Sequence, residues 1–209
     1  MQQEIHANFI PSKIICVGRN YSEHAAELGN EVPKEPLIFL KAPSSLIFNG
    51  DTILIPQQSH QVEHEAELAV IIGNDCKDIK DNEDPFQFVH GFTCLNDVTA
   101  RDIQRHDVQF TRGKSFDTFC PIGPWIETEL DVSDIRICCS VNGEIKQDGR
   151  TSQMVFPVDF LIRYISRQMT LQKGDIIATG TPAGVSKLEP GDVCEIEIEG
   201  IGKLTNYVM

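Results

Sequence analysis

The chain has 209 residues and a net charge of −13 at pH 7, because 31 acidic side chains outnumber 18 lysines and arginines. This acidity argues against nucleic acid or an anionic membrane surface as a partner, since contacts to phosphates require clusters of basic side chains. No apolar run approaches the roughly 18 residues of a membrane span, and the first residues show no basic segment followed by an apolar one. We therefore expect a cytoplasmic protein.

The composition also bears on the number of domains and on the cysteines. Neither a Ser/Gly-rich linker nor an internal repeat divides the sequence, so we expect a single domain over residues 1–209. The seven cysteines are odd in number and include no Cys-x-x-Cys pair, which argues against a disulfide framework and a zinc site. We expect them to be reduced and mostly buried.

The first predicted elements are a strand over residues 13–18 and a short helix over 21–28. The strand is an apolar run closed by a glycine. Asn20 is expected to cap the helix with its side chain, and Gly29 is expected to end it. The helix would then begin directly after the strand.

His24 and Glu27 are three residues apart on this predicted helix and therefore share one face. A carboxylate beside an imidazole raises its basicity and fixes its tautomer, so the pair is a candidate general base. An exposed surface pair without a catalytic role is the alternative.

A second group of strands follows. Residues 37–40 predict a strand, with Lys41 as a lone cation at its end. Asn49-Gly50 is typical of a tight turn, and it predicts a β-hairpin between strands over 46–48 and 52–55.

Two glutamates open the next apolar run. Residues 68–72 predict a buried strand, and Glu65 and Glu67 precede or begin it on one face, so their carboxylates should lie side by side. Such anions repel unless one is protonated or a cation is bound. Asp97, after a predicted strand over 89–95, would be a third oxygen ligand for a hard ion such as Mg2+ or Mn2+. A solvated edge strand is the alternative.

Two polar segments follow this strand. Residues 99–105 predict a helical turn that carries Arg101 and Gln104 on one side. Residues 111–119 predict an exposed loop with two cations, one of which is Lys114.

The second half of the chain contributes further short strands. Residues 135–141 predict a strand that turns at Asn142-Gly143, and the alternating pattern over 193–198 predicts a half-exposed strand. Residues 160–166 predict an amphipathic helix whose apolar stripe includes Phe160. Many short strands, frequent turns and few helices predict a β-rich α+β fold.

Five motifs in this order resemble the fumarylacetoacetate hydrolase family. They are Val17-Gly18-Arg19-Asn20-Tyr21 with His24 and Glu27, Glu65-x-Glu67-Leu68, Asn96-Asp97-Val98-Thr99-Ala100-Arg101-Asp102, Gly113-Lys114-Ser115-Phe116-Asp117 and Thr179-Gly180-Thr181-Pro182. The resemblance runs from about Lys13 to Leu204 and leaves residues 1–12 as an N-terminal extension. It is nearest to the small single-domain members, which include acylpyruvate hydrolases and oxaloacetate decarboxylases. The additional N-terminal domain of the longer hydrolases is expected to be absent.

The resemblance implies a mixed β-sandwich roll, usually a homodimer, that holds Mg2+ or Mn2+ through Glu65, Glu67 and Asp97. It also implies that His24 and Glu27 act in catalysis on a segment that orders over the site as a lid.

Further site residues follow from the same resemblance. Lys114 matches the catalytic lysine of the family. Residues where substrate contacts are expected are Arg19, Tyr21, Arg101, Gln104 and Thr181. His64 departs from the family pattern, since many members carry an aromatic residue there, and this difference should affect packing more than metal binding.

The implied substrate is a small anionic 2-keto acid, and the implied reaction is C–C bond hydrolysis of an acylpyruvate. Water activated by His24 and Glu27 would attack the distal carbonyl, and cleavage would give a carboxylate and pyruvate, through an enolate stabilised by the metal. Oxaloacetate decarboxylation would pass through the same enolate. The alternatives are an isomerase or hydratase of 2-hydroxy-dienoates in aromatic catabolism, and a metabolite-binding domain without catalysis.

Overall fold

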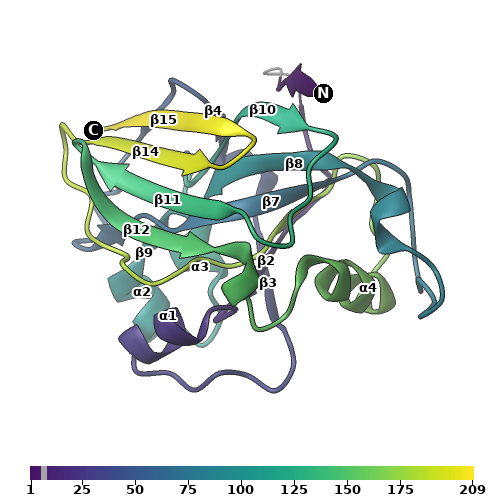
Figure 1. Ribbon diagram of the computed structural model, residues 1–209. Helices are drawn as coiled ribbons and strands as arrows, with labels where there is room; N and C mark the ends of the chain where they lie inside the picture. Colours follow the sequence, from purple (N-terminus) through teal and green to yellow (C-terminus); the bar gives the residue numbers. More distant parts are fainter. Residues whose placement is uncertain (6–8) are drawn as a thin grey trace.

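The computed structural model describes residues 1–5 and 9–209. Over these residues the chain forms two β-sheets packed against each other, a two-stranded ribbon and a few short helices (Figure 1). The prediction of a β-rich α+β fold, a mixed β-sandwich roll, is confirmed. Part of the predicted extension, residues 6–8, lies outside the described residues.

The larger sheet is mixed, because β13 runs parallel to β2 and β4 runs parallel to β10, whereas the other pairs are antiparallel. In spatial order its strands are β1 (Gln2–Glu4), β10 (Cys120–Glu127), β8 (Val89–Asn96), β7 (Ala66–Ile72), β13 (Ile176–Ala178), β2 (Ile14–Gly18) and β3 (Leu37–Lys41), with β4 (Leu46–Phe48) beside β10. Every residue of β7 is buried, as expected for a continuous apolar run in the middle of a sheet.

The second sheet is smaller and half-exposed. Its strands, in spatial order, are β12 (Glu144–Arg150), β11 (Arg136–Val141), β14 (Val193–Ile198), β15 (Gly202–Val208) and β5 (Thr52–Ile53); the separate ribbon pairs β6 (Val62–Glu63) with β9 (Thr99–Ala100). The predicted turn at Asn142-Gly143 joins β11 to β12 and is confirmed. Burial alternates along β14, as predicted.

The helices are short and lie at the edges of the sheets. They are α1 (Ser22–Glu27), α2 (Arg101–His106), α3 (Thr111–Lys114) and α4 (Val158–Gln168), with 3-10 turns at Pro43–Ser45, Pro85–Phe88 and Thr151–Gln153. The first three gather on one side of the molecule, away from α4 (Figure 1). In the described chain, no helix is long and apolar enough to cross a membrane.

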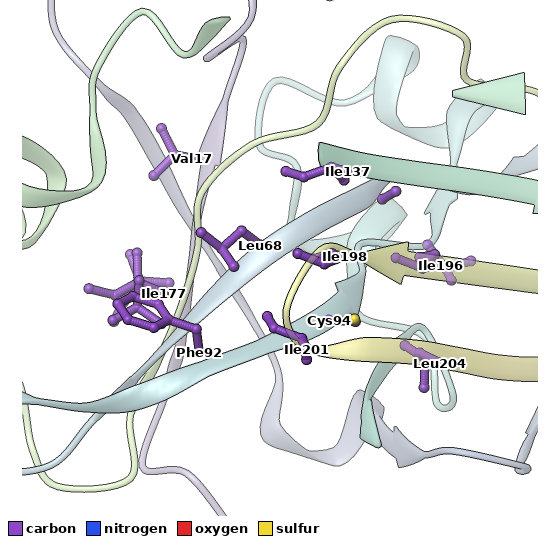
Figure 2. Packing of buried hydrophobic residues seen from close by; sticks show 14 of the residues in the cluster. Val17, Leu68, Phe92, Cys94, Ile137, Ile177, Ile196, Ile198, Ile201 and Leu204 are labelled. Atoms are coloured by element: carbon purple, nitrogen blue, oxygen red, sulfur yellow. The ribbon is translucent and has the colours of Figure 1, made fainter. Parts of the chain in front are cut away.

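The main core lies between the two sheets. In Figure 2, Leu68 and Phe92 of the larger sheet lie in one cluster with Ile137 and Ile198 of the smaller sheet. Burying one such side chain contributes about 1.5–3 kcal/mol. A second cluster, which includes Ile71, covers the outer face of the larger sheet and explains why its central strands are apolar on both faces.

The predicted hairpin at Asn49-Gly50 is wrong. The chain does turn there, with Asp51 donating its backbone N–H to the Phe48 carbonyl at 3.1 Å. However, β4 pairs with β10 in the larger sheet, whereas β5 pairs with β15 in the smaller one. The turn therefore carries the chain between sheets, because distant strands offer both segments better partners than each other.

The predicted cap at Asn20 is also wrong. Its side-chain amide donates to the carbonyls of Phe156 at 3.0 Å and Thr179 at 2.7 Å, and its oxygen accepts from the Phe156 N–H at 2.8 Å. The helix begins one residue later than predicted, with Tyr21 at the N-cap and no side-chain cap. Asn20 thus joins β2 to two distant loops, while Gly29 ends the helix region in a left-handed conformation as expected.

The apolar stripe predicted for the amphipathic helix over residues 160–166 is partly wrong. In α4 the buried face includes Leu161, Ile162 and Ile165, but Phe160 is 43% exposed and stacks outside on Phe156 and Tyr164. The prediction for the cysteines is confirmed: all seven are free and six are buried.

Candidate active site

Two adjacent strand ends bring the three predicted metal ligands together. Because β7 and β8 are antiparallel, the start of β7 lies beside the end of β8, and the Asp97 N–H donates to the Glu65 carbonyl at 2.9 Å. The Asn96 side chain accepts from the Glu65 N–H, also at 2.9 Å. Carboxylate oxygens of Glu65, Glu67 and Asp97 lie within 4.8 Å of one another.

This group, the carboxylate triad, is buried. Glu65 is 5% exposed, and Glu67 and Asp97 are each 1% exposed. The alternative of a solvated edge strand is therefore wrong. Burying three carboxylates requires compensating charge, and the neighbouring side chains show how it is supplied.

Two lysines contact Asp97. Lys41 Nζ lies 2.6 Å from one carboxylate oxygen of Asp97, and Lys114 Nζ lies 2.5 Å from the other and 2.7 Å from Glu65. Lys41 is therefore no lone cation at a strand end but a buried partner of the triad. Its role depends on a pairing 56 residues away, which no local pattern reveals.

Lys114 corrects the prediction of an exposed loop, since it is only 2% exposed and lies at the end of α3. The preceding Gly113 allows this placement. A Cβ atom there would lie 3.0 Å from the Gln104 nitrogen and 3.1 Å from the Ala100 carbonyl oxygen. The close backbone approach brings the Lys114 side chain in toward the triad.

Arg101 completes the ring of cations. Its guanidinium donates to Glu63 at 2.7 Å, to Glu65 and to the Gln104 side chain, so Arg101 and Gln104 lie on one side of the helix, as predicted, and are also hydrogen-bonded. Glu63 is 6% exposed and was missed by the sequence analysis. It stands two residues before Glu65 and so shares its face, which is the pattern that could have revealed it.

The charges of the described cluster nearly cancel. Four carboxylates face three cations, a net charge of −1 when all are ionised, and a divalent ion would change it to +1. The groups counted are Glu63, Glu65, Glu67, Asp97, Lys41, Arg101 and Lys114.

Glu65 and Glu67 differ sharply in this environment. Burial opposes the ionisation of Glu65, but Lys114 and Arg101 outweigh it and hold the pKa of that carboxyl below its usual range. Burial, Asp97 and Glu65 raise the pKa of Glu67 well above its usual range. Among the described residues Glu67 has no ion-pair partner, and one oxygen accepts from the Gly180 N–H at 2.7 Å.

The environment of Glu67 shows whether the triad suits a metal ion. A buried carboxylate that faces two others without a cation of its own is stabilised by a bound cation. An all-oxygen set of three carboxylates suits hard divalent ions such as Mg2+ or Mn2+. The residues present therefore fit a divalent metal at the triad.

The predicted base pair also forms. His24 Nδ1 lies 3.2 Å from Glu27 Oε2, and Glu27 Oε1 accepts from the Gly184 N–H at 3.0 Å. His24 is 4% exposed whereas Glu27 is exposed, so the imidazole of the pair is buried and the carboxylate lies at the surface. Helix α1 thus presents the imidazole to the same cavity as the triad.

That cavity has a volume of about 500 Å³ and is lined by nine of the eleven predicted site residues. The nine are Arg19, His24, Glu65, Glu67, Asp97, Arg101, Gln104, Lys114 and Thr181. Glu27 contacts His24 but does not line the cavity. The Tyr21 hydroxyl is buried without a hydrogen-bond partner, lines a separate hollow beside Pro182, and has a raised pKa because of burial and the nearby Glu67.

A buried amide of the second sheet supports the site and was not predicted. Gln147 on β12 accepts from the Ala66 N–H at 3.0 Å and donates to the Thr181 hydroxyl at 2.7 Å. The Thr181 hydroxyl in turn donates to the Ala66 carbonyl at 2.8 Å. Gln147 therefore ties the start of β7 to the loop over residues 179–184.

His64 joins this network. Its Nδ1 lies 2.9 Å from Gln147 Oε1, an acceptor, so Nδ1 carries the proton and Nε2 accepts from the Ser186 hydroxyl at 2.8 Å. Burial lowers the pKa of His64, which agrees with a neutral ring. The departure from the family pattern at this position is thus a polar contact as well as a packing change.

Comparison with known proteins shows the family to which the chain belongs. Residues 13–209 match the model of the fumarylacetoacetate (FAA) hydrolase C-terminal domain. The chain belongs to the fumarylacetoacetate hydrolase family. An uncharacterized protein of Methanocaldococcus jannaschii is 55% identical, over 95% of this chain and 83% of the relative. The oxaloacetate tautomerase FAHD2A, mitochondrial, of Homo sapiens is 46% identical, over 95% of this chain and 67% of the relative.

Solved structures of family members share the fold. The crystal structure of 5-carboxymethyl-2-hydroxymuconate delta-isomerase from Mycobacterium smegmatis matches with a TM-score of 0.90 and 46% identity, over 96% of this chain and 80% of that chain. The family recognised from the five motifs is therefore confirmed, and relatives named as a tautomerase and an isomerase show that it includes enzymes.

Proposed function

We propose that this chain is a divalent-metal-dependent enzyme that hydrolyses a C–C bond of an acylpyruvate-type 2,4-diketo acid, giving pyruvate and a carboxylate. The observation that carries the proposal is that one cavity is lined by both the carboxylate triad and His24, whose imidazole contacts Glu27. A cation site and a proton acceptor on one cavity suit a reaction that moves a proton beside a carbonyl.

The triad would hold the metal. Bound to Glu65, Glu67 and Asp97, Mg2+ or Mn2+ would supply positive charge for the two oxygens of a 2-keto acid. The protein's own residues prepare this site: Lys114 forms ion pairs with Glu65 and Asp97 and holds both in place, and the Gly180 N–H orients Glu67.

His24 and Glu27 would handle the proton. With Glu27 accepting from Nδ1, the other ring nitrogen of His24 is free to take a proton from water. The oxygen of that water bonds to the distal carbonyl carbon, the C–C bond breaks, and its electron pair passes to the pyruvate fragment as an enolate. The enolate then takes the proton that His24 removed from the water and leaves as pyruvate. The carboxylate product takes the oxygen.

A second candidate is isomerisation or tautomerisation of a 2-keto acid or a 2-hydroxy-dienoate, favoured by the printed names of relatives. It needs proton transfer by the same His24 but no attack by water. Decarboxylation of oxaloacetate is a further activity that the same cavity would support.

We also infer that the chain acts in the cytoplasm as one catalytic domain and as a homodimer. The free, mostly buried cysteines fit a reducing compartment. Sedimentation velocity of the purified chain tests the homodimer, since a single species at the monomer mass of 23.4 kDa would contradict it.

The deciding experiment is a panel of acylpyruvates, fumarylpyruvate and oxaloacetate with Mg2+, followed by substrate loss and pyruvate release. Pyruvate in equal amount to the diketo acid consumed supports hydrolysis. An isomerised product without pyruvate supports the second candidate. No turnover with any substrate, with and without EDTA treatment and metal addition, would favour a non-catalytic metabolite-binding domain.

A further inference from the structure

One carboxylate of the buried cluster, Glu63, has no part in the proposed reaction. It is 6% exposed, it does not belong to the carboxylate triad, and within the described chain it is not among the residues that line the cavity. It is therefore placed to contact neither a metal at the triad nor a bound substrate. Burying a carboxylate is costly, so a residue in this position must be stabilised by, and act on, its neighbours.

The ribbon of β6 and β9 places Glu63 beside Arg101. Glu63 on β6 pairs with Thr99 on β9, and α2 begins with Arg101 two residues later. The Arg101 backbone N–H also donates to the Gln61 carbonyl at 2.7 Å. The ribbon therefore fixes the start of the Arg101 side chain against the segment that carries Glu63.

Glu63 and Arg101 hold each other in a defined orientation. Glu63 Oε2 accepts from Arg101 Nε at 2.7 Å, and Glu63 Oε1 accepts from the Gln61 side-chain amide at 2.6 Å. The other two nitrogens of the guanidinium donate to Gln104 and Glu65. Each oxygen of Glu63 and each nitrogen of the guanidinium thus has a partner, so neither group is free to rotate.

This arrangement leaves Glu65 able to bind a metal ion. A guanidinium frequently pairs with one carboxylate through two parallel hydrogen bonds, which here would occupy both oxygens of Glu65. Because Glu63 takes Nε, Arg101 contacts only Oε1 of Glu65, while Lys114 contacts Oε2. A carboxylate has about four lone-pair sites, so about two sites on Glu65 remain for a cation.

Glu63 also sets the charge of the cluster. With Glu63 ionised, four carboxylates and three cations carry −1, which attracts a divalent ion. Without its charge the same cluster would carry 0, and binding of a divalent ion would raise it to +2 instead of +1. Such differences matter in a buried site, where charges are screened less than in water.

We propose that Glu63 is a positioning residue for the metal site. It holds Arg101 to a single hydrogen bond with Glu65, and it supplies the negative charge that allows the triad to bind a divalent ion. This inference rests on the proposed function for the metal at the triad. It adds that metal affinity depends on a carboxylate that does not contact the ion.

Two substitutions separate position from charge. Glu63→Gln keeps an acceptor for Arg101 and removes the charge, whereas Glu63→Ala removes both. By isothermal titration calorimetry, Mn2+ affinity should fall roughly 10-fold in Glu63→Gln and up to about 100-fold in Glu63→Ala, the range for losing a partner of a metal ligand. Thermal melting with EDTA present checks that each variant is folded, and Glu63→Gln, which keeps the buried contact, carries the test if Glu63→Ala does not fold.

A second background tests whether Glu63 acts through Arg101. In Arg101→Gln no guanidinium remains to be directed, so adding Glu63→Ala should lower Mn2+ affinity no more than Glu63→Gln does in the wild type. A merely structural role for Glu63 would lower the melting temperature and leave Mn2+ affinity unchanged in both backgrounds.

Glu189→Gln removes the same charge from an exposed pair with Lys187, and this control should bind Mn2+ like the wild type. Wild-type Mn2+ affinity in the Glu63 variants would overturn this inference alone, as would an equal loss from Glu63→Ala in both backgrounds. A wild type that binds no Mn2+ would overturn the metal assignment of the proposed function, and this inference with it.

Discussion

The two sides of the carboxylate triad are stabilised in different ways. On one side Glu65 and Asp97 are held by three cations of the protein, namely Lys41, Arg101 and Lys114. On the other side Glu67 receives a backbone N–H from Gly180 and has no ion-pair partner in the described chain. The comparison teaches that the fold neutralises two of its carboxylates itself and leaves the third for a bound cation.

Asp97→Ala should have the largest effect, because it removes the carboxylate that pairs with both Lys41 and Lys114. Lys41 would lose its carboxylate, and an unpaired buried charge costs about 3–5 kcal/mol. We expect loss of Mg2+ binding and of turnover, together with a large fall in the free energy of unfolding in urea, measured with EDTA present. An unchanged Mg2+-dependent rate would contradict the metal assignment.

Glu67→Gln should remove metal binding and turnover but leave the metal-free fold intact. The amide keeps the shape of the side chain and removes a charge that Asp97 and Glu65 repel, so the free energy of unfolding without metal should stay equal or rise. Titration calorimetry with Mn2+ and urea unfolding with EDTA measure the two effects. A stability loss as large as that of Asp97→Ala would show that the two sides of the triad are alike.

Saturating metal provides the matching control for this variant. At 100 times its dissociation constant, Mg2+ should stabilise the wild type by about 2.7 kcal/mol and leave Glu67→Gln unchanged. Glu129→Gln, at an exposed position away from the cavity, should respond like the wild type.

His24→Ala should affect the proton rather than the metal. Loss of a positioned acid or base lowers rates by about 10²- to 10⁴-fold, so we expect hydrolysis to fall by that amount while Mn2+ affinity stays the same. Decarboxylation of oxaloacetate, which needs no attacking water, should be less affected. Equal loss of both activities would show that activation of water is not the role of this residue.

Gln147→Leu should have the smallest effect. It removes hydrogen bonds that hold Ala66, which lies between Glu65 and Glu67, and Thr181 in place. It leaves the Ala66 N–H without its acceptor, at a cost of about 1–3 kcal/mol, and removes the donor to the Thr181 hydroxyl, which keeps its bond to the Ala66 carbonyl. Loss of such an outer contact typically weakens metal affinity by about 10- to 100-fold. Unfolding in urea and titration with Mn2+ measure both, and normal metal affinity would confine Gln147 to a role in stability.

Local patterns in the sequence predicted the parts of the site that lie within one element or at its end. Glu65 and Glu67 are separated by the strand period, and His24 and Glu27 by the helix period, so their shared faces follow from backbone geometry. The end of the next strand placed Asp97 beside them. Family membership and the sandwich fold then followed from the order of the motifs.

The parts of the site and fold that the sequence did not predict depend on contacts between segments that are distant in the chain. Lys41 has no local sign of burial, because its partner Asp97 lies on another strand, and Lys114 is drawn inward by the close approach of Gly113 to α2. The turn at Asn49-Gly50 was predicted from its residues, but which strands pair on either side depends on competition among all strands of both sheets. Side-chain pairing across a fold is decided by tertiary structure rather than by propensity.

The loop over residues 179–184 contacts both the carboxylate triad and the pair formed by His24 and Glu27. Its Gly180 N–H holds Glu67, and its Gly184 N–H holds Glu27, which in turn orients the imidazole. Both glycines have φ near +100°, and a Cβ atom on either would collide with neighbouring atoms. A displacement of this one segment would therefore shift the cation site and the proton acceptor together, so their separation is set by five residues of backbone and not by two independent walls.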